Sequence, residues 1–258
     1  MKLNQSVKKA IAILRAASAD TSGATASALA RGAGLPWATA VRLIRTLEEE
    51  GFLSRLPDSD RYVLGFDLIR LGRAGDQGVF LKTVALPQLR RLAEDVGETV
   101  NLTAVRPDGE FEVVEHIDPP RLIAPVRFSG EPYPLHASSI GKLLLASYDG
   151  ARFEEFLAEP LSSYTSATIT DPGALRAEIA QIREQGYSVA VDELEDGLAA
   201  LSVAVTSAER ELLAIVSVSG PSFRFDEAAR AAALDPVREA VGAIERRIAG
   251  RPAAAPAA

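Results

Sequence analysis

The sequence GLPWATAVRLIRTLEEEGFL, residues 34–53, sets the architecture of the N-terminal part of the chain. Pro36 follows a glycine-leucine pair and stands where proline is favoured, at the first position of a helix. The helix is expected to run to about Glu50, because Gly51 ends its periodic pattern. Its apolar face carries Ala40, Leu43, Ile44 and Leu47, and its opposite face carries Thr39, Arg42, Arg45 and Thr46. The stretch therefore predicts a helix with an apolar back and a front of arginine and threonine.

Two shorter helices are predicted before this one. Ser6 can cap a first helix with the i, i+3, i+4, i+7 spacing of a buried face, which is made of Val7, Ala10, Ile11 and Leu14. Thr25 or Ser27 starts a second helix, which Gly34 closes by supplying the positive φ of a C-terminal cap. Two helices joined by a tight glycine-containing turn, the second with a basic front, are typical of a helix-turn-helix. The second helix of this motif fits the major groove of DNA and presents its N-terminal half to base edges.

Two strand-like runs follow the helix and predict a wing. Residues 52–56 and 61–64 flank the turn Pro57-Asp58-Ser59-Asp60, and the arginines at its base are expected to reach phosphates. Arg42 is the first candidate for base or phosphate contact, because a guanidinium bonds bidentately to guanine or phosphate oxygens. Trp37, the only tryptophan, either stacks on DNA or packs between helices. The candidate DNA contacts are Trp37, Thr39, Arg42, Arg45, Thr46, Arg55 and Arg61; each arginine taken alone could also be a solvated side chain.

Charge is unevenly distributed along the chain. The 258 residues include 28 Lys and Arg against 35 Asp and Glu, a formal net charge of −7, which as a bulk property argues against a nucleic-acid partner. Residues 1–73, however, hold 11 basic and 7 acidic side chains, a net +4, and the other 185 residues hold 17 and 28, a net −11. This asymmetry favours a basic nucleic-acid module joined to an acidic domain with another task, the alternative being chance clustering on two solvated surfaces.

Several classes of site are excluded by composition. The chain has no cysteine and two histidines, His116 and His136, so a disulfide scaffold, a thiolate metal site and a cysteine nucleophile are excluded, and we expect no metal and no cofactor. The acidic run Asp192, Glu193, Glu195 and Asp196 has no histidine partner and is interpreted as a solvated loop. No run of 18 apolar residues and no signal-peptide layout occurs, so we expect a cytoplasmic protein without a membrane partner.

The second part of the chain is predicted to be an α+β domain with an antiparallel sheet flanked by helices. Strands are expected at 99–105, 111–117, 122–128, 187–191, 198–206 and 212–219, and helices at 81–96, 138–148, 151–158, 173–185 and 226–249. The expected organisation is a winged helix-turn-helix domain at 1–65, a linker helix at 66–80, a second domain at 81–250 and a disordered tail at 251–258.

Each part of the chain contains several short sequence motifs. The N-terminal ones are Gly34-Leu35-Pro36, Thr39, Arg42-Leu43, Thr46-Leu47, Glu50-Gly51-Phe52-Leu53 and Tyr62-Val63-Leu64-Gly65. The later ones are Leu86-Pro87-Gln88-Leu89, Gly97-Glu98-Thr99-Val100-Asn101-Leu102, Leu135-His136-Ala137-Ser138-Ser139-Ile140-Gly141-Lys142, Gly186-Tyr187 and Ser217-Val218-Ser219-Gly220-Pro221. Each is weak alone, but together and in this order they resemble the IclR-type bacterial transcriptional regulators over nearly the whole chain.

The resemblance implies a GAF-like second domain that binds a small molecule, usually an organic acid or an aromatic compound. It also implies a homodimer, often a dimer of dimers, on a palindromic operator of double-stranded DNA. The pocket residues carried over from the family are Leu122, Ser139, Ile140, Leu198, Ala200, Ser217 and Ser219. Ala190 and Ala200 stand where relatives that sense small keto acids often have an acid and a cysteine, which predicts a roomier and less polar pocket.

Part of this pocket follows from the residues themselves. Ser217 and Ser219 alternate along a strand, so they share one face and are candidates to hydrogen-bond a carboxylate, unless they bond locally in a satisfied core. Residues 138–141 precede a helix whose free N–H groups favour an anion. An acidic effector is therefore expected.

Two functions remain open from the sequence. The first is a ligand-responsive repressor or activator. The second is a small-molecule-binding or hydrolytic protein whose N-terminal segment only mediates dimerisation. His136 beside Ser138 or Ser139 suggests a nucleophile and base, yet no Gly-x-Ser-x-Gly elbow and no Gly-x-x-x-x-Gly-Lys phosphate loop is present. We therefore expect no catalytic residue.

Overall fold

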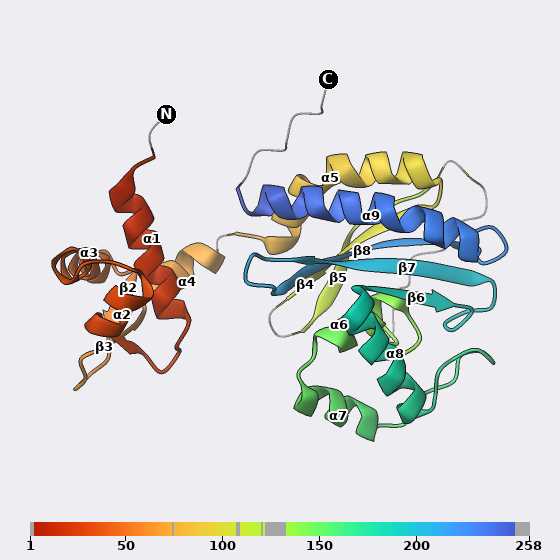
Figure 1. Cartoon of the computed structure of the whole chain (residues 1–258), viewed down its shortest axis with the longest axis horizontal. Coiled ribbons are helices and arrows are strands. Elements are labelled where there is room, and N and C mark those ends of the chain that lie inside the picture. Colours follow the sequence, from red (N-terminus) through yellow and green to blue (C-terminus); the bar gives the residue numbers. More distant parts are fainter. Residues whose placement is uncertain (1–2, 74, 107–108, 120, 122–132, 251–258) are drawn as a thin grey trace. The chain divides into compact units, whose positions relative to one another are not determined.

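The chain divides into two compact units, residues 1–76 and 77–258 (Figure 1). The computed structural model describes residues 3–73, 75–106, 109–119, 121 and 133–250. Each unit is taken in turn.

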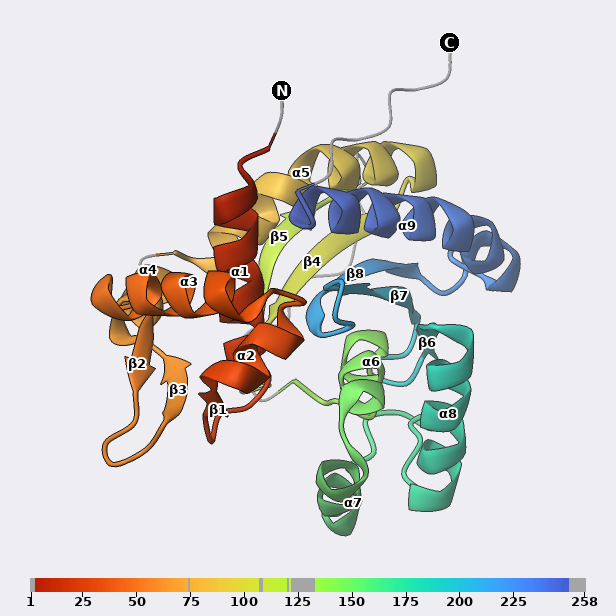
Figure 2. The ribbon, with the colours of Figure 1, turned by 60° about the vertical axis from the view of Figure 1, so that its left-hand side comes forward.

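The first unit is a winged helix-turn-helix. Its helices are α1 (Gln5–Ser18), α2 (Ala26–Gly32), α3 (Trp37–Glu49) and α4 (Phe66–Arg73). In the described residues its strands, β1 (Ala24–Thr25), β2 (Leu53–Arg55) and β3 (Arg61–Leu64), pair antiparallel in the order β1-β3-β2. The β2–β3 hairpin projects beyond the helices of this unit and is the predicted wing (Figure 2). Strand β1 was not predicted, because two residues carry no periodic signal.

The turn between α2 and α3 is closed by backbone hydrogen bonds. The amide of Leu35 donates to the carbonyl of Ala30 at 2.9 Å, and the amide of Gly34 donates to that of Arg31 at 3.0 Å. This pattern is a Schellman motif, which needs a left-handed residue, and Gly34 supplies it with φ +64°. The glycine predicted to end α2 therefore sets the entry into α3, with Pro36 at the N-cap and not at the first helical position.

The core of this unit confirms the stripe predicted for α3 and corrects the one predicted for α1. Ala40, Ile44 and Leu47 are buried, with Leu43 packed against them. On α1, however, the buried residues are Ile13 and Ala17, whereas Val7 and Ile11 are exposed. The sequence does not distinguish two possible stripes on α1, because residues 7, 10, 11 and 14 have the same spacing as residues 10, 13, 14 and 17. The cap of α1 is Asn4 and not Ser6, since the Asn4 Oδ1 accepts the amides of Ser6 and Val7.

Residues 66–80, which the sequence assigns to one linker helix, form the whole of α4 and the start of α5 (Gln77–Val96). The two helices fall in different units.

The second unit contains an antiparallel sheet covered by helices, as predicted. In its described residues the strands are β4 (Thr99–Val105), β5 (Phe111–Ile117), β6 (Tyr187–Val191), β7 (Leu198–Thr206) and β8 (Leu212–Pro221). They pair in the order β5-β4-β8-β7-β6. The helices after α5 are α6 (Ser139–Ser147), α7 (Gly150–Ala158), α8 (Pro172–Gln185) and α9 (Glu227–Ile248). The expected strand at 122–128 and the expected disordered tail at 251–258 lie outside the described residues.

The two faces of this sheet differ in character. Helices α5 and α9 lie side by side on one face, where apolar strand residues such as Val100, Leu102, Leu201, Val216 and Val218 form a core with them (Figure 1). Helix α6 contacts β6, β7 and β8 on the other face, and α8 packs against α6. We call this second face the inner face. It carries the polar side chains described next.

Candidate DNA-binding surface and ligand site

The front of α3 is open to solvent. Arg42, Arg45 and Thr46 are exposed and Thr39 is half-buried. The hydroxyl of Thr46 donates to the carbonyl of Arg42 at 3.1 Å, so it is held along the helix. Trp37, the first residue of α3, is 57% exposed and therefore is not packed between the helices of this unit. The front of α3 thus offers two guanidinium groups for which no partner is found among the described residues, and the exposed indole of Trp37 lies at the start of the same helix.

The wing arginines are already partly engaged. The Arg55 Nε donates to the carbonyl of Ser59 at 2.8 Å, within the hairpin. The Arg61 Nη1 donates to the carbonyl of Gly23 at 2.6 Å and so ties β3 to the loop before β1. Hydrogen bonds from Ser22 lower the pKa of Asp20, and the charge of Arg61 acts in the same direction. Arg61 therefore has a structural contact that sequence reasoning did not foresee.

A row of polar side chains crosses the inner face of the second unit. Because Val216 and Val218 point into the core with α5 and α9, Ser217 and Ser219 of the same strand face the other way. Ser217 lies opposite Asn101 on β4 and opposite Ser202 on β7. The row continues at its two ends, since Asn101 pairs with a β5 residue and Ser202 with a β6 residue. We call these side chains the polar row: His116, Asn101, Ser217, Ser202 and Ser188.

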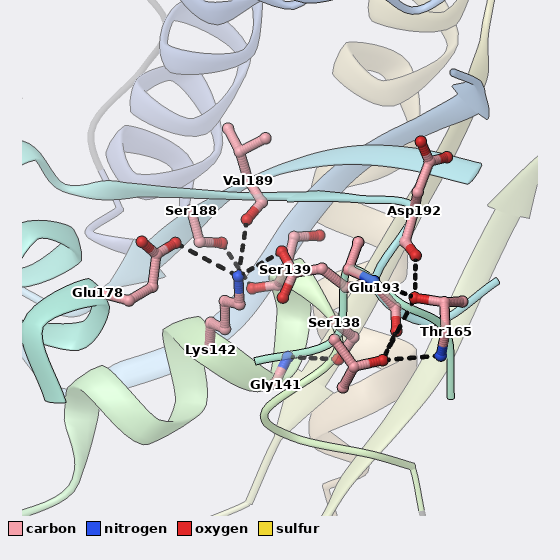
Figure 3. Close-up of polar contacts among 12 residues, drawn as sticks. Ser138, Ser139, Gly141, Lys142, Thr165, Glu178, Ser188, Val189, Asp192 and Glu193 are labelled. Carbon is pink, nitrogen blue, oxygen red and sulfur yellow. Dashed lines mark hydrogen bonds and ion pairs between the residues drawn. The ribbon is translucent and has the colours of Figure 1, made fainter. Parts of the chain in front are cut away.

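Helix α6 begins directly over this row. The hydroxyls of Ser139 and Ser202 lie 2.7 Å apart, and the hydroxyl of Ser188 donates to the carbonyl of Ser139 at 2.5 Å (Figure 3). The cap is Ser138, whose Oγ accepts the amide of Gly141 at 3.1 Å. A side chain at Gly141 would lie 2.3 Å from the Leu135 Cα, so only glycine lets the incoming segment pass this close.

The structure describes six of the seven predicted pocket residues: four lie on the inner face of β7 and β8, and two lie in the first turn of α6. Ser219 and Ala200 are paired neighbours beside the polar row, and Leu198 shares their face at the start of β7. Ile140 follows Ser139 in α6 and is buried. Leu122 lies outside the described residues. The buried Ser217 Oγ has no hydrogen-bond partner in the described part of the chain, so the alternative of a locally satisfied core does not hold for it.

A buried ion pair lies next to the contacts of Ser139, one turn further along α6. Lys142 is 1% exposed, and its Nζ lies 2.6 Å from the Glu193 Oε1 and 3.3 Å from both the Glu178 Oε1 and the carbonyl of Val189 (Figure 3). The interpretation of Glu193 as part of a solvated acidic loop is therefore wrong. Its partner is 51 residues away in sequence, which local spacing cannot reveal. A lysine in the apolar run of α6 was the available signal.

The pKa of Glu193 is set by two opposing effects. Burial raises it above its usual range, and the positive charge of Lys142 opposes that rise. A carboxyl with a raised pKa favours the folded state at low pH, and this contribution is lost as the pH rises through that pKa. The charge of Lys142 thus offsets part of the cost of burying the Glu193 carboxyl group.

The loop before α8 is fastened to the same segment. The hydroxyl of Thr168 donates to the carbonyl of Glu193 at 2.6 Å, and that of Thr165 donates to the carbonyl of Asp192 at 2.5 Å. His136 bonds through its Nε2 to the carbonyl of Ser162 at 2.8 Å, so its ring holds a loop and has no serine hydroxyl as partner.

The residues that the structure describes contain neither a cluster of metal-ligating side chains nor a helix able to span a membrane. No group of three or more histidine, aspartate or glutamate side chains among them could hold a metal ion. None of their helices is both long and apolar enough to cross a membrane.

A winged helix-turn-helix, which places a helix in the major groove of DNA, joined to a second domain built on an antiparallel sheet defines a class, the transcription regulators. Residues 6–57 match the family model of the IclR helix-turn-helix domain, and residues 77–246 match that of the bacterial transcriptional regulator IclR C-terminal domain. The chain belongs to the IclR family of transcriptional regulators.

Individual relatives agree with this assignment. The chain is 32% identical to the transcriptional repressor IclR of Escherichia coli over 81% of its own length and 77% of the relative. A regulator structure from Silicibacter has a TM-score of 0.62 at 26% identity, covering 96% of this chain and 98% of that one. An IclR homologue of Microbacterium hydrocarbonoxydans, complexed with 4-hydroxybenzoate, has a TM-score of 0.60 at 28% identity, covering 95% and 100%. The protein is therefore a DNA-binding transcriptional regulator and not an enzyme, and the hydrolytic alternative is not favoured.

Replacing Lys142 by methionine should lower the free energy of unfolding of the second unit by about 3–5 kcal/mol at neutral pH, because the buried carboxyl group of Glu193 loses its partner. The loss should shrink as the pH falls through the raised pKa of Glu193, and a second substitution, Glu193→Gln, should recover most of it. Denaturant unfolding followed by circular dichroism at neutral and mildly acidic pH measures both effects.

The matched control is Lys82→Met. Lys82 pairs with Glu115 at 3.0 Å, but its side chain is 48% exposed, so its replacement should cost less than about 1 kcal/mol. Equal losses for the two lysines, or a loss at Lys142 that does not depend on pH, would contradict the assignment.

Proposed function

We propose that this regulator binds a small organic or aromatic acid on the inner face of its second unit, and that the acid changes operator affinity or transcriptional output. The observation that carries the proposal is the Ser217 hydroxyl, which is buried and has no hydrogen-bond partner in the described part of the chain. A buried hydroxyl without a partner is costly, and a ligand that accepts its hydrogen bond removes that cost.

The start of α6 favours an acid as that ligand. The Oγ of the cap residue Ser138 accepts a hydrogen bond from the amide of Gly141. The amides of Ser139 and Ile140 remain for a ligand at the positive, N-terminal end of the helix. Free N–H groups at a helix N-terminus bind carboxylates well. The homologue complexed with 4-hydroxybenzoate supports an aromatic acid. The pocket residues proposed are those carried over by resemblance, Leu122, Ser139, Ile140, Leu198, Ala200, Ser217 and Ser219.

On the DNA side, α3 is proposed to lie in the major groove. Arg42 contacts a base or phosphate, Thr39 and Trp37 lie toward the N-terminal half of the helix, and Arg45 and Thr46 contact the backbone. The exposure of both arginines supports this arrangement. Arg55 and Arg61 contact phosphates beside the groove through the part of each guanidinium that the wing leaves free. The regulator acts in the cytoplasm, where bacterial DNA lies.

The exposed stripe on α1 supports a dimer. Val7 and Ile11, four residues apart on α1, are 54% and 44% exposed, and Leu3, which precedes the Asn4 cap of that helix, is 66% exposed. Side chains with this spacing lie on one face of a helix, and a contiguous apolar face is a candidate interface. We infer a homodimer, able to pair into a dimer of dimers, which reads a palindromic operator by its two-fold symmetry.

Arg42→Ala and Arg45→Ala should each weaken the binding of DNA and flatten its dependence on salt. Each lost phosphate contact lowers the slope of log affinity against log salt by about 0.9. Retention of the full chain on immobilised random-sequence duplex DNA, measured over a series of salt concentrations, checks this. Arg90→Ala, an exposed arginine on α5, is the control and should leave the slope unchanged. If both α3 variants are retained on DNA as the wild type is at every salt concentration, the proposed interface is wrong.

Ile11→Asp should convert the dimer to a monomer, because it places a charge in the apolar stripe of α1. Sedimentation velocity of the full chain measures this directly. Gln5→Asp is the control, since Gln5 is exposed on α1 outside the stripe. A wild-type monomer, or an Ile11→Asp variant that still sediments as a dimer, is incompatible with this interface.

The double variant Ser217→Ala, Ser219→Ala should lose the thermal stabilisation that an acid effector gives the wild type. A thermal-shift screen of aromatic and aliphatic acids identifies the effector and then compares the variants. The ligand-free double variant should remain folded, because the Ser217 hydroxyl has no partner to lose among the described residues. Ser166→Ala, an exposed serine, serves as the control. Unchanged affinity in the double variant would rule out this site.

A further inference from the structure

Gln77 is the first residue of the second unit and the first residue of α5. Its Nε2 donates to the carbonyl of Val105 at 3.0 Å and to that of Leu213 at 3.5 Å. Val105 is the last residue of β4 and Leu213 is the second residue of β8, and these two strands are neighbours in the sheet. The two N–H groups of one side-chain amide therefore join the ends of two strands.

The amide of Gln77 lies where the pairing of these strands stops. The paired positions of β4 and β8 end at Ala104 opposite Ala214. Val105 and Leu213 are the next residue on each strand, and the carbonyls of both accept the amide of Gln77. We call this arrangement the Gln77 clasp: the side chain of Gln77 with the carbonyls of Val105 and Leu213. It closes one end of the β4–β8 ladder.

The strands that the clasp joins also carry buried hydroxyls on the inner face. Thr99 and Thr103 of β4 alternate with Val100 and Leu102, which point into the core with α5 and α9. The hydroxyls of these two threonines and of Ser217 on β8 are buried and have no hydrogen-bond partner in the part of the chain that the structure describes. A ligand on the inner face that contacts either strand therefore acts on the pair of strands that the clasp holds.

The clasp is also close in sequence to the winged unit. Residues 74–76 alone separate the end of α4 at Arg73 from Gln77. A fully extended chain spans about 3.5 Å per residue, so at most roughly 14 Å of chain joins the clasp to the last helix of the winged unit. A connection of this length restrains α4, and the restraint is set by the position of Gln77.

We propose that Gln77 is a positioning residue for regulation: through the carbonyls of Val105 and Leu213 it passes a shift of β4 and β8 to the winged unit. The inference rests on the proposed function, because it assumes that the second unit controls the binding of DNA. A coupling between two binding sites is reciprocal. DNA bound to the winged unit should therefore change the ends of β4 and β8, even without an effector.

Hydrogen exchange of the full chain, with and without a random-sequence DNA duplex at low salt, tests this reciprocity. In the wild type the duplex should change the exchange rates of amides within residues 77–82, 103–106 and 211–215 by about 5-fold or more. Gln77→Glu keeps the shape of the side chain and removes both N–H donors. This variant should bind the duplex as the wild type does and lose the change in exchange.

Two further variants separate the hydrogen bonds of Gln77 from its charge and from its packing. Gln88→Glu is the matched control, because it makes the same change of charge and shape on the same helix, away from the clasp, and it should keep the wild-type response. Gln77→Arg keeps N–H donors at the clasp and should retain part of the response. Equal losses in Gln77→Arg and Gln77→Glu, or a loss in Gln88→Glu, would contradict the clasp.

The remaining outcomes distinguish this inference from the proposed function. If the wild type binds the duplex but the ends of β4 and β8 do not respond, the role of Gln77 is wrong and the DNA-binding surface stands. The role is likewise wrong if Gln77→Glu responds as the wild type does. If the full chain does not bind the duplex at low salt, the proposed DNA-binding surface fails and this inference fails with it.

Discussion

Ser139 holds helix α6 on the inner face of the sheet, and the geometry of the proposed ligand site depends on this contact. Its hydroxyl lies against that of Ser202 and its carbonyl accepts the hydroxyl of Ser188. One residue at the first turn of the helix thereby satisfies two members of the polar row. The remaining hydroxyl of the row, on Ser217, is left without a partner in the described residues, directly beside the positive end of α6. The contacts of Ser139 with Ser202 and Ser188 thus hold the helix and also leave the Ser217 hydroxyl available to a ligand.

The ion pair of Lys142 adds a second contact one turn further along α6, next to that of Ser139. Removing two charges from water costs nearly as much as their attraction returns, so such a pair contributes little net stability. The ion pair instead fixes the position of α6. Glu193 belongs to the segment after β6, and the backbone carbonyls of that segment accept hydrogen bonds from Thr165 and Thr168 in the loop before α8. The pair therefore fixes α6 relative to that loop, which an apolar contact of the same size would allow to slide.

Sequence reasoning succeeded where one segment contains the whole signal. The stripe of α3 and the alternation of Ser217 and Ser219 repeat with the period of their element, and both are placed as predicted. It failed where the buried face of a helix, or the neighbours of a side chain, depend on another segment that packs against it. Two stripes of equal spacing compete on α1, and Ile13 is buried in place of Ile11 because α2 and α3 pack on that side. The polar row joins strands from Asn101 to Ser217, and only the pairing register shows that these side chains are adjacent.

The strands of the ligand site also reach the beginning of α5. Gln77, the first residue of that helix, donates from its Nε2 to the carbonyl of Val105 at 3.0 Å and to that of Leu213 at 3.5 Å. Val105 ends β4 and Leu213 is near the start of β8, the two strands that carry the unpartnered hydroxyls. A ligand shifts a conformational equilibrium only through contacts that differ between the states. Under the proposed function, a ligand that forms hydrogen bonds with β4 and β8 makes such contacts. The same two strands hold Gln77, the first residue after the winged unit, so a shift of these strands would move that residue.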